Sequence, residues 1–285
     1  SYKIDNYMKF FFKTGKILAI IPPYDNSVTR FQTIYTICIV AFITTTAILS
    51  IIERDYFAKY IYAKIAVNLI ADVNLLLCTY TSTLGVVIWK KTEWEKLMAN
   101  IKIMVVLENT RTFLRNIVKV SVFKLFFDLI INVCVYIFRV RTHGFIPCST
   151  TYGIHYIELY IIYAYVTVVS FMLGVVKLQY KHLNTVLKQQ LETTNISIKK
   201  TLIVLTKIEQ NIYFLKDAVD NLNTVVEWPV FFIISYTSLY MLTSLDYIYV
   251  ASIKAEENVG LRILADVIVS FLMFVRVLNT FLHFN

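Results

Sequence analysis

The residues of this chain that could do chemistry are aspartates inside apolar stretches, with tyrosines nearby. Asp72, Asp128 and Asp266 each interrupt a hydrophobic run. An aspartate at the centre of a membrane helix costs about 2.5 to 3.5 kcal/mol on insertion scales, so it is normally tolerated only where it faces a cavity or a partner. Acid and phenol groups in one apolar-walled pocket would anchor a small organic ligand. The predicted ligand-binding residues are Asp72, Asp128, Tyr136, Tyr160, Tyr163, Tyr240 and Asp266.

A second interpretation of these residues needs no ligand. Tyrosines gather at membrane interfaces, and aspartates close to the headgroups stay solvated. This interpretation suits Asp246 and Tyr247, which lie near the end of an apolar run. It suits Asp128 least, because that residue lies near the middle of its run.

Enzyme chemistry has no support in the sequence. The four histidines are isolated, and neither HExxH nor CxxC occurs, so no metal site is expected. The six glycines never cluster into a phosphate-binding loop. We therefore expect no catalysis, no metal and no cofactor.

The elements that must position these residues are membrane helices. Of the 285 residues, 58% are hydrophobic and 16% charged, and the mean hydropathy of +0.63 is far above that of soluble domains. A bilayer core of ~30 Å needs about 20 apolar residues per helix. We predict an all-α membrane protein, a bundle forming a single polytopic domain over 1–285. Its six predicted transmembrane helices are 32–52, 66–88, 117–138, 157–178, 228–250 and 261–283.

The distribution of Lys and Arg predicts the orientation. Basic residues concentrate in the segments 1–31, 89–116 and 179–227 and are sparse on the other side, which places the amino terminus in the cytoplasm. All three tryptophans, Trp89, Trp94 and Trp228, fall at or near the cytoplasmic ends of the second and fifth spans, where indole rings prefer the headgroup level. The net charge of +9, with no basic tract, indicates an anionic lipid bilayer as partner and no nucleic acid. We expect a multi-pass protein of the plasma membrane.

The segment 179–227 is predicted to be a cytoplasmic helical linker. Apolar residues recur there at alternating spacings of three and four, the pattern of a heptad seam. Such a seam packs either on the chain's own bundle or membrane surface, or in a helical cluster with other subunits; we favour the second. Pro229 follows, so a continuous helix with a kink into the fifth span is expected. The predicted anchor residues are Leu205, Ile208, Ile212, Leu215, Val219 and Leu222.

Two stretches carry a resemblance to a known family. The fourth span runs straight into LQYKHLNTVL (178–187), and the heptad helix ends in LKDAVDNLNTVVEWPVFFIISYTSLYMLTSLDYIYV (215–250). This region, from about 160 to 280, resembles the insect gustatory receptor family. The cytoplasmic amino terminus is similar to that of this family and of the related odorant receptors.

The resemblance implies a subunit of a ligand-gated cation channel, assembled as a homo- or hetero-tetramer. It also implies a tastant pocket on the extracellular side among the first six helices, a cytoplasmic helical anchor, and a seventh helix that lines the pore and carries TYxxxxxQF. That motif does not occur in this chain. Because the chain begins with Ser1 and its last apolar run stops at Asn285, we expect it to be incomplete at both ends. Because the motif is missing and the chain ends where the connection to the seventh helix should begin, we expect it to be truncated before the pore helix.

Two functions of different classes follow from these observations. The first is a gustatory chemoreceptor subunit that binds a small organic tastant in the outer half of the bundle. The alternative is a six-helix secondary transporter, in which Asp72, Asp128 and Asp266 would bind protons or cations.

Overall fold

The structure is a computed structural model that describes residues 30–53, 62–106, 111–192, 198–254 and 275, nearly all of them helical. The prediction of an all-α protein is therefore confirmed. In chain order the helices are α2 (Arg30–Glu53), α4 (Tyr62–Leu84), the π-helix η1 (Gly85–Trp89), α5 (Lys91–Val106), α6 (Arg111–His143), α7 (Phe145–Glu192) and α8 (Ile198–Lys254).

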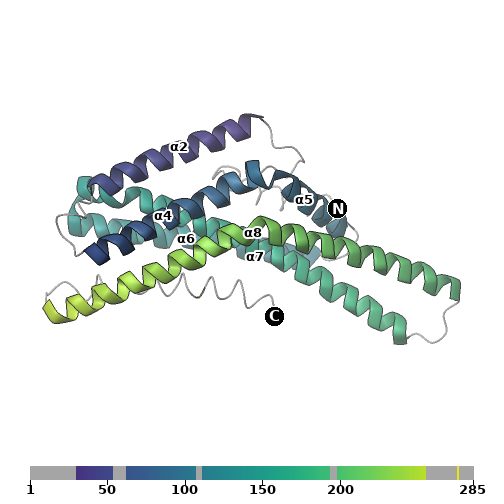
Figure 1. Ribbon diagram of the computed structural model, residues 1–285. Coiled ribbons are helices and arrows are strands. Elements are labelled where there is room, and N and C mark those ends of the chain that lie inside the picture. Colours follow the sequence, from purple (N-terminus) through teal and green to yellow (C-terminus); the bar gives the residue numbers. More distant parts are fainter. Residues whose placement is uncertain (1–29, 54–61, 107–110, 193–197, 255–274, 276–285) are drawn as a thin grey trace.

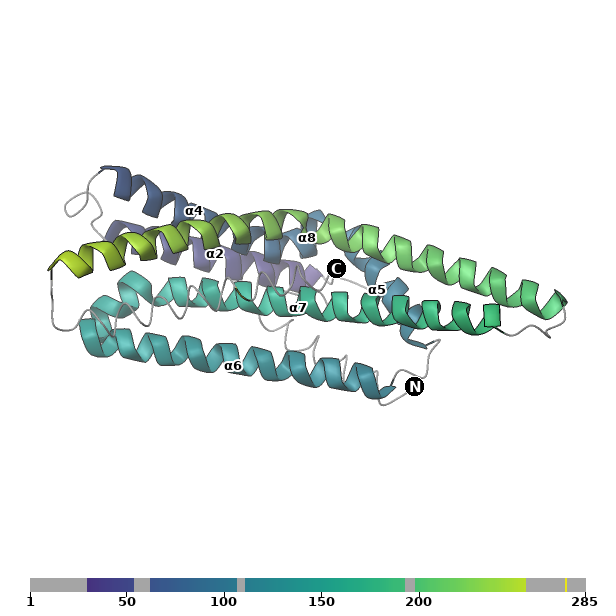
Figure 2. The same ribbon diagram turned by 90° about the horizontal axis from the view of Figure 1, so that it is seen from below.

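The long helices form an elongated bundle in which α2, α4, α6, α7 and α8 run alternately in opposite directions (Figure 1). Helix α7 lies at its centre and contacts α2, α4, α5, α6 and α8. Of the most apolar stretch of α7, 72% is buried, against 17% for α6, which borders the bundle. Helices α7 and α8 continue past the others as an antiparallel pair (Figure 2).

Five of the helical segments are long and apolar enough to cross a bilayer. They are Arg30–Glu53, Ile65–Trp89, Asn116–Phe138, Tyr152–Gln189 and Leu205–Asp246. They correspond to the first five predicted spans, whereas the sixth, 261–283, lies outside the described residues. Many large apolar side chains on α2 and α6, such as Ile52 and Phe123, are exposed. An apolar outer surface of this kind suits a lipid environment.

The segment 179–227 is helical apart from the short part outside the described residues, because α7 runs on to Glu192 and α8 begins at Ile198. Helix α8 continues through Pro229, as expected. With 57 residues, α8 is about 85 Å long at 1.5 Å per residue, far more than a hydrocarbon core of ~30 Å. A large part of α8 must therefore project from the apolar part of the bundle.

The segment 89–116, which connects the second and third predicted spans, contains helix α5. Trp94, Leu97, Met98 and Ile101 are all buried, and α5 packs on α8. Their spacing is that of one helical face. Trp94 is 4% exposed, so its ring packs against the protein.

Two local features set the directions of successive helices. Gly144, the residue between α6 and α7, has a φ of 83°, a left-handed conformation that favours glycine and reverses the chain there. In η1, the amide of Lys90 donates to the carbonyl of Gly85 at 2.7 Å, which closes the wider π turn before α5.

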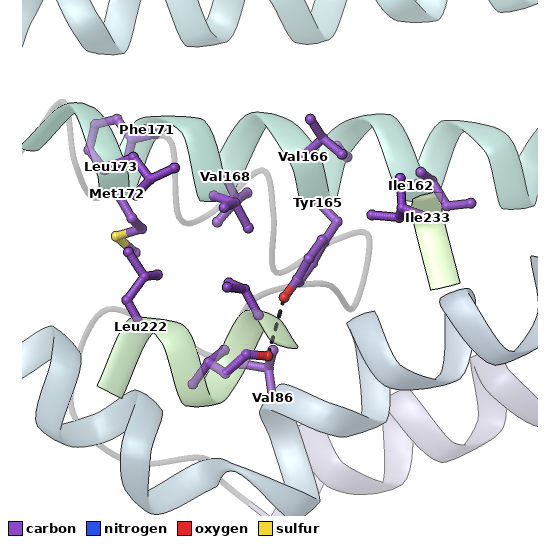
Figure 3. Close-up of a cluster of buried hydrophobic side chains, with 14 of the residues drawn as sticks. Val86, Ile162, Tyr165, Val166, Val168, Phe171, Met172, Leu173, Leu222 and Ile233 are labelled. Carbon is purple, nitrogen blue, oxygen red and sulfur yellow. Dashed lines mark hydrogen bonds between the residues drawn. The ribbon is translucent and has the colours of Figure 1, made fainter. Parts of the chain in front are cut away.

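The core between α7 and α8 is closely packed (Figure 3). On α7, Ile162, Tyr165 and Met172 point toward α8, which contributes Leu222 and Ile233. These side chains are buried, and η1 adds Val86 to the same cluster. The core therefore holds α7 against the middle of α8, where Pro229 lies.

Candidate ligand-binding site

The predicted ligand-binding residues fall into two groups, one at a cavity beside α2 and α6 and one around Tyr236 of α8. Tyr136 and Tyr160 line a cavity between α2, α6 and α7. Tyr163 and Tyr240 belong to a second group, in the interface of α7 with α8. One prediction, Asp266, lies outside the described residues.

The cavity, here called the lateral pocket, has a volume of about 620 Å³. Each helix contributes residues spaced three or four apart, because such residues share one helical face. The lining is mostly apolar, with a few polar groups. It consists of Phe42, Thr46, Leu49, Glu53, Leu129, Asn132, Val133, Tyr136, Ser149, Thr150, Gly153, Ile154, Tyr156, Ile157 and Tyr160.

Hydrogen bonds between α6 and α7 hold the wall of the lateral pocket in place. The side-chain amide of Asn132 donates to the backbone carbonyl of Tyr156 at 2.7 Å. The hydroxyls of Tyr136 and Ser149 are 2.7 Å apart and share a hydrogen bond. The rings of Tyr136 and Tyr156 meet edge to face with centroids 5.6 Å apart, a favourable arrangement for aromatic pairs.

Asp128 does not line the pocket but lies directly behind its wall. Its side chain is fully buried, one turn before Asn132 on α6. The carboxylate is close enough to Tyr160 to interact with it electrostatically.

The second group, here called the inner cluster, surrounds Tyr236 of α8. The Tyr236 hydroxyl and Nε2 of His155 are 3.2 Å apart and form a hydrogen bond between α8 and α7. Tyr236 also interacts electrostatically with Asp72, Glu158, Tyr163 and Tyr240. Glu158 is 3% exposed, so a carboxylate lies deep between α4, α7 and α8.

Sequence reasoning missed several residues of both groups. His155 was set aside as isolated, and Glu158 was not singled out although it is a carboxylate inside an apolar run. The cost argument that selected Asp128 applies equally to Glu158. Gly153 carried no signal, since its part in the pocket is the space that it leaves open. Asp246 is exposed on α8.

The predicted anchor residues differ in burial between the two sides of the heptad seam on α8. Ile208, Leu215 and Leu222 are buried, and Val219 is half-buried. Helix α5 packs on this part of the bundle, and Asn100 of α5 donates to Asp217 of α8 at 2.5 Å. By contrast, Leu205 and Ile212 are exposed. The seam is therefore covered in part by the chain itself.

A comparison of the chain with models of known protein families and with curated proteins finds no match.

Proposed function

We propose that this chain is a gustatory chemoreceptor subunit of the ligand-gated cation channel type. In this proposal it resides in the plasma membrane with its amino terminus in the cytoplasm, and a small organic tastant binds in the lateral pocket. Related subunits assemble with it into a homo- or hetero-tetramer through the projecting part of α7 and α8. The family resemblance of 178–187 and 215–250 supports the class of receptor.

The observation that carries the proposal is the position and character of the lateral pocket. It lies where α2 and α6 end and α7 begins. The charge distribution predicts that this end of the bundle faces outward. A cavity with apolar walls and a few fixed polar groups is the usual form of a small-molecule site.

Helix α7 supplies a mechanical connection from this pocket to the proposed anchor. The same helix lines the pocket with Gly153 and Tyr160, packs along α8 in the core, and ends at Glu192 beside the start of α8. A ligand that shifts α7 at the pocket would therefore act on the projecting pair. This coupling requires that the ligand bind two arrangements of the helices with different affinity.

The test exploits Gly153, because a Cβ at this position meets no atom within 4 Å. Gly153→Phe fills the lateral pocket, whereas Gly153→Ala adds a single carbon and serves as the matched control. Cells expressing the chain together with a full-length family subunit are exposed to fructose, caffeine and denatonium while cation current is recorded. We expect a response to at least one of them that Gly153→Phe abolishes and Gly153→Ala retains. Equal responses in both variants would exclude the pocket.

A secondary transporter is the second candidate, and the burial of Asp128 and Glu158 favours it. Buried membrane carboxylates often exchange protons. The transporter predicts substrate uptake into liposomes that stops when the proton gradient is collapsed, and it predicts loss of this uptake in Glu158→Gln. If the chain is a receptor subunit, the ligand should evoke a current, and the reversal potential of that current should follow the cation gradient.

A further inference from the structure

The polar side chains of the lateral pocket are largely engaged in hydrogen bonds within the protein. The hydroxyl of Thr46 donates to the backbone carbonyl of Phe42 at 2.8 Å, and that of Thr150 donates to the carbonyl of Ile146 at 3.1 Å. A hydroxyl group has a single hydrogen to donate. These two threonines therefore spend theirs on their own helices, not on a ligand.

The connection between α6 and α7 engages three more polar side chains. The side-chain amide of Asn132 donates to the carbonyl of Tyr156 at 2.7 Å. The hydroxyl of Ser149 donates to the Phe145 carbonyl at 2.7 Å, so in the bond that joins Tyr136 and Ser149 the tyrosine is the donor. A ligand with several hydroxyl groups would bury them here with few partners, which is costly.

The lining of the pocket also offers little charge. The described residues that line it include no Lys, Arg or His, so they hold no cationic group that could pair with an anion. Glu53 supplies a carboxylate, but it is exposed on the last turn of α2, where water screens its charge. An ionic ligand would lose hydration in the pocket without gaining a buried partner. The lining therefore favours an uncharged ligand.

The rim of the pocket is apolar and lies on the outer surface of the bundle. Helices α2 and α6 each pack more closely on α7 than on one another, which leaves the cavity open between them. Several side chains line the cavity and are nevertheless exposed, with Phe42 at 61% and Leu49 at 55%, whereas Ile154 and Tyr156 form a buried inner wall. The exposed apolar residues of the rim are Phe42, Leu49, Leu129, Val133 and Ile157.

This opening extends along the apolar length of the helices. Phe42 and Glu53 are 11 residues apart on α2, about 16 Å along the helix axis at 1.5 Å per residue. On α6, Leu129 and Val133 lie within the stretch Asn116–Phe138, which is apolar enough to cross a bilayer. In a bilayer with a hydrocarbon core of ~30 Å, such an opening faces acyl chains as well as the headgroup level. A molecule dissolved in the bilayer can thus enter the pocket from the side.

We propose that the lateral pocket binds uncharged lipophilic molecules, which enter it from the bilayer between α2 and α6. The inference rests on the proposed function, since it names the ligand class of the same pocket. Burial of the apolar body of the ligand supplies the affinity, because the polar groups of the wall are engaged with the protein. The volume of about 620 Å³ is sufficient for a compact body of this kind.

The test uses adamantane diazirine, an uncharged lipophile that attaches to nearby residues on illumination. The protein is labelled in nanodiscs, and mass spectrometry locates the attached probe. We expect labelling of the inner-wall residues Ile154, Tyr156 and Tyr160 that an excess of 1-adamantanol displaces. Phe123 is the internal control, because it is 72% exposed on α6 and does not line the pocket. Its labelling from the lipid should not change with 1-adamantanol.

Competitors of nearly the same shape test the role of charge. 1-Adamantanol is neutral at pH 7, 1-adamantanamine is protonated, and adamantane-1-carboxylate is ionised. The three are compared at equal mole fraction in the bilayer, so that partitioning does not decide the result. We expect the alcohol to displace the label at a mole fraction at least about tenfold lower than either ion, a difference of ~1.4 kcal/mol. Equal or stronger displacement by an ion would refute the selectivity for uncharged ligands.

Two pairs of variants test the pocket itself. Gly153→Phe should abolish the displaceable labelling of the inner wall, and Gly153→Ala should retain it, because the added carbon meets no atom within 4 Å. Thr46→Val keeps the shape of the side chain and removes a hydroxyl that donates to its own helix. It should change displacement by 1-adamantanol by less than about twofold, and Thr46→Asn, which adds an amide, should weaken it. A loss of tenfold or more in Thr46→Val would show that the hydroxyl binds the ligand. Displacement in the wild type decides the question if Gly153→Phe fails to fold.

Failure of this inference can be told apart from failure of the proposed function. Displaceable labelling of the inner wall without an evoked current supports the lipophile site and refutes the receptor. An evoked current that Gly153→Phe abolishes, without displaceable labelling, supports the receptor and overturns the ligand class. A photoreactive phosphatidylcholine that labels the inner wall and is not displaced by 1-adamantanol would show that a lipid chain fills the pocket, which also overturns the inference.

Discussion

The hydroxyl of Tyr165 on α7 donates to the backbone carbonyl of Val225 on α8, with the two oxygens 3.5 Å apart (Figure 3). Val225 is the residue whose carbonyl would accept the amide of position 229 in a regular helix, and position 229 is proline. Proline has no amide hydrogen. A side chain of α7 thus serves a carbonyl that the interruption of α8 leaves without its helical donor.

This relationship predicts a thermodynamic coupling between Tyr165 and Pro229. Tyr165→Phe should lower the free energy of unfolding by about 0.5 to 1.5 kcal/mol, because a buried carbonyl loses its donor. The loss should shrink in a Pro229→Ala background, where alanine restores the helical amide. The free energies of unfolding of the wild type, the two single variants and the double variant are measured by unfolding titrations in mixed micelles. Tyr213→Phe, on an exposed ring of α8, is the control. Equal losses in the two backgrounds would show that the hydroxyl serves another purpose.

A second prediction concerns the contact of α5 with α8. Asn100 is 8% exposed, and its amide donates to Asp217 at 2.5 Å. Asn100→Ala should destabilise the protein by about 1 to 3 kcal/mol, because the partly buried carboxylate loses a donor. The ion pair between Lys90 and Glu227 is longer, 3.5 Å, and more exposed. Glu227→Gln should therefore change stability by less than about 1 kcal/mol. The same unfolding titration compares the two variants. A larger loss of stability in Glu227→Gln than in Asn100→Ala would contradict this prediction.

The divided heptad seam predicts two kinds of effect from neighbouring residues. Leu215→Ala should cost about 2 to 5 kcal/mol in the free energy of unfolding, because it leaves a cavity against the rest of the bundle. Ile212→Asp replaces an exposed side chain and should leave that free energy nearly unchanged. It should, however, reduce association between subunits, measured by cross-linking in membranes. Unchanged cross-linking would favour the interpretation in which this face lies on the membrane.

The predicted orientation is tested by glycosylation. Asn195, Ile196 and Ser197 form an acceptor sequon that lies outside the described residues, between the end of α7 and the start of α8. If this end of the bundle is cytoplasmic, Asn195 should carry no sugar, and endoglycosidase treatment should not change the mass of the chain. A flexible insert with a sequon at Gly144, the opposite end, should be glycosylated. Sugar on Asn195 would invert the topology.

The sequence by itself determined the helical architecture of the described residues and which helices are long and apolar enough to cross a membrane. An apolar run of about 20 residues has few stable alternatives to a membrane helix, because every backbone amide and carbonyl must be paired within the lipid. This constraint is local, so the five helices that are long and apolar enough to cross a membrane could be predicted from composition alone. The continuous helix through Pro229 was also predicted from the local sequence. Helix α5 was missed because it is short, and its charged residues obscured an apolar face of only a few side chains.

Only the tertiary structure decided which residues share a site. Tyr160 and Tyr163 are three residues apart, yet the first lines the lateral pocket and the second is buried in the inner cluster. Likewise, Ile208 is buried while Leu205 is exposed. The rotation of a helix about its axis depends on the shapes of all the helices packed on it. Hydrophobicity along one chain segment carries the period of a helix, but the partner that each face meets is a property of the assembled bundle.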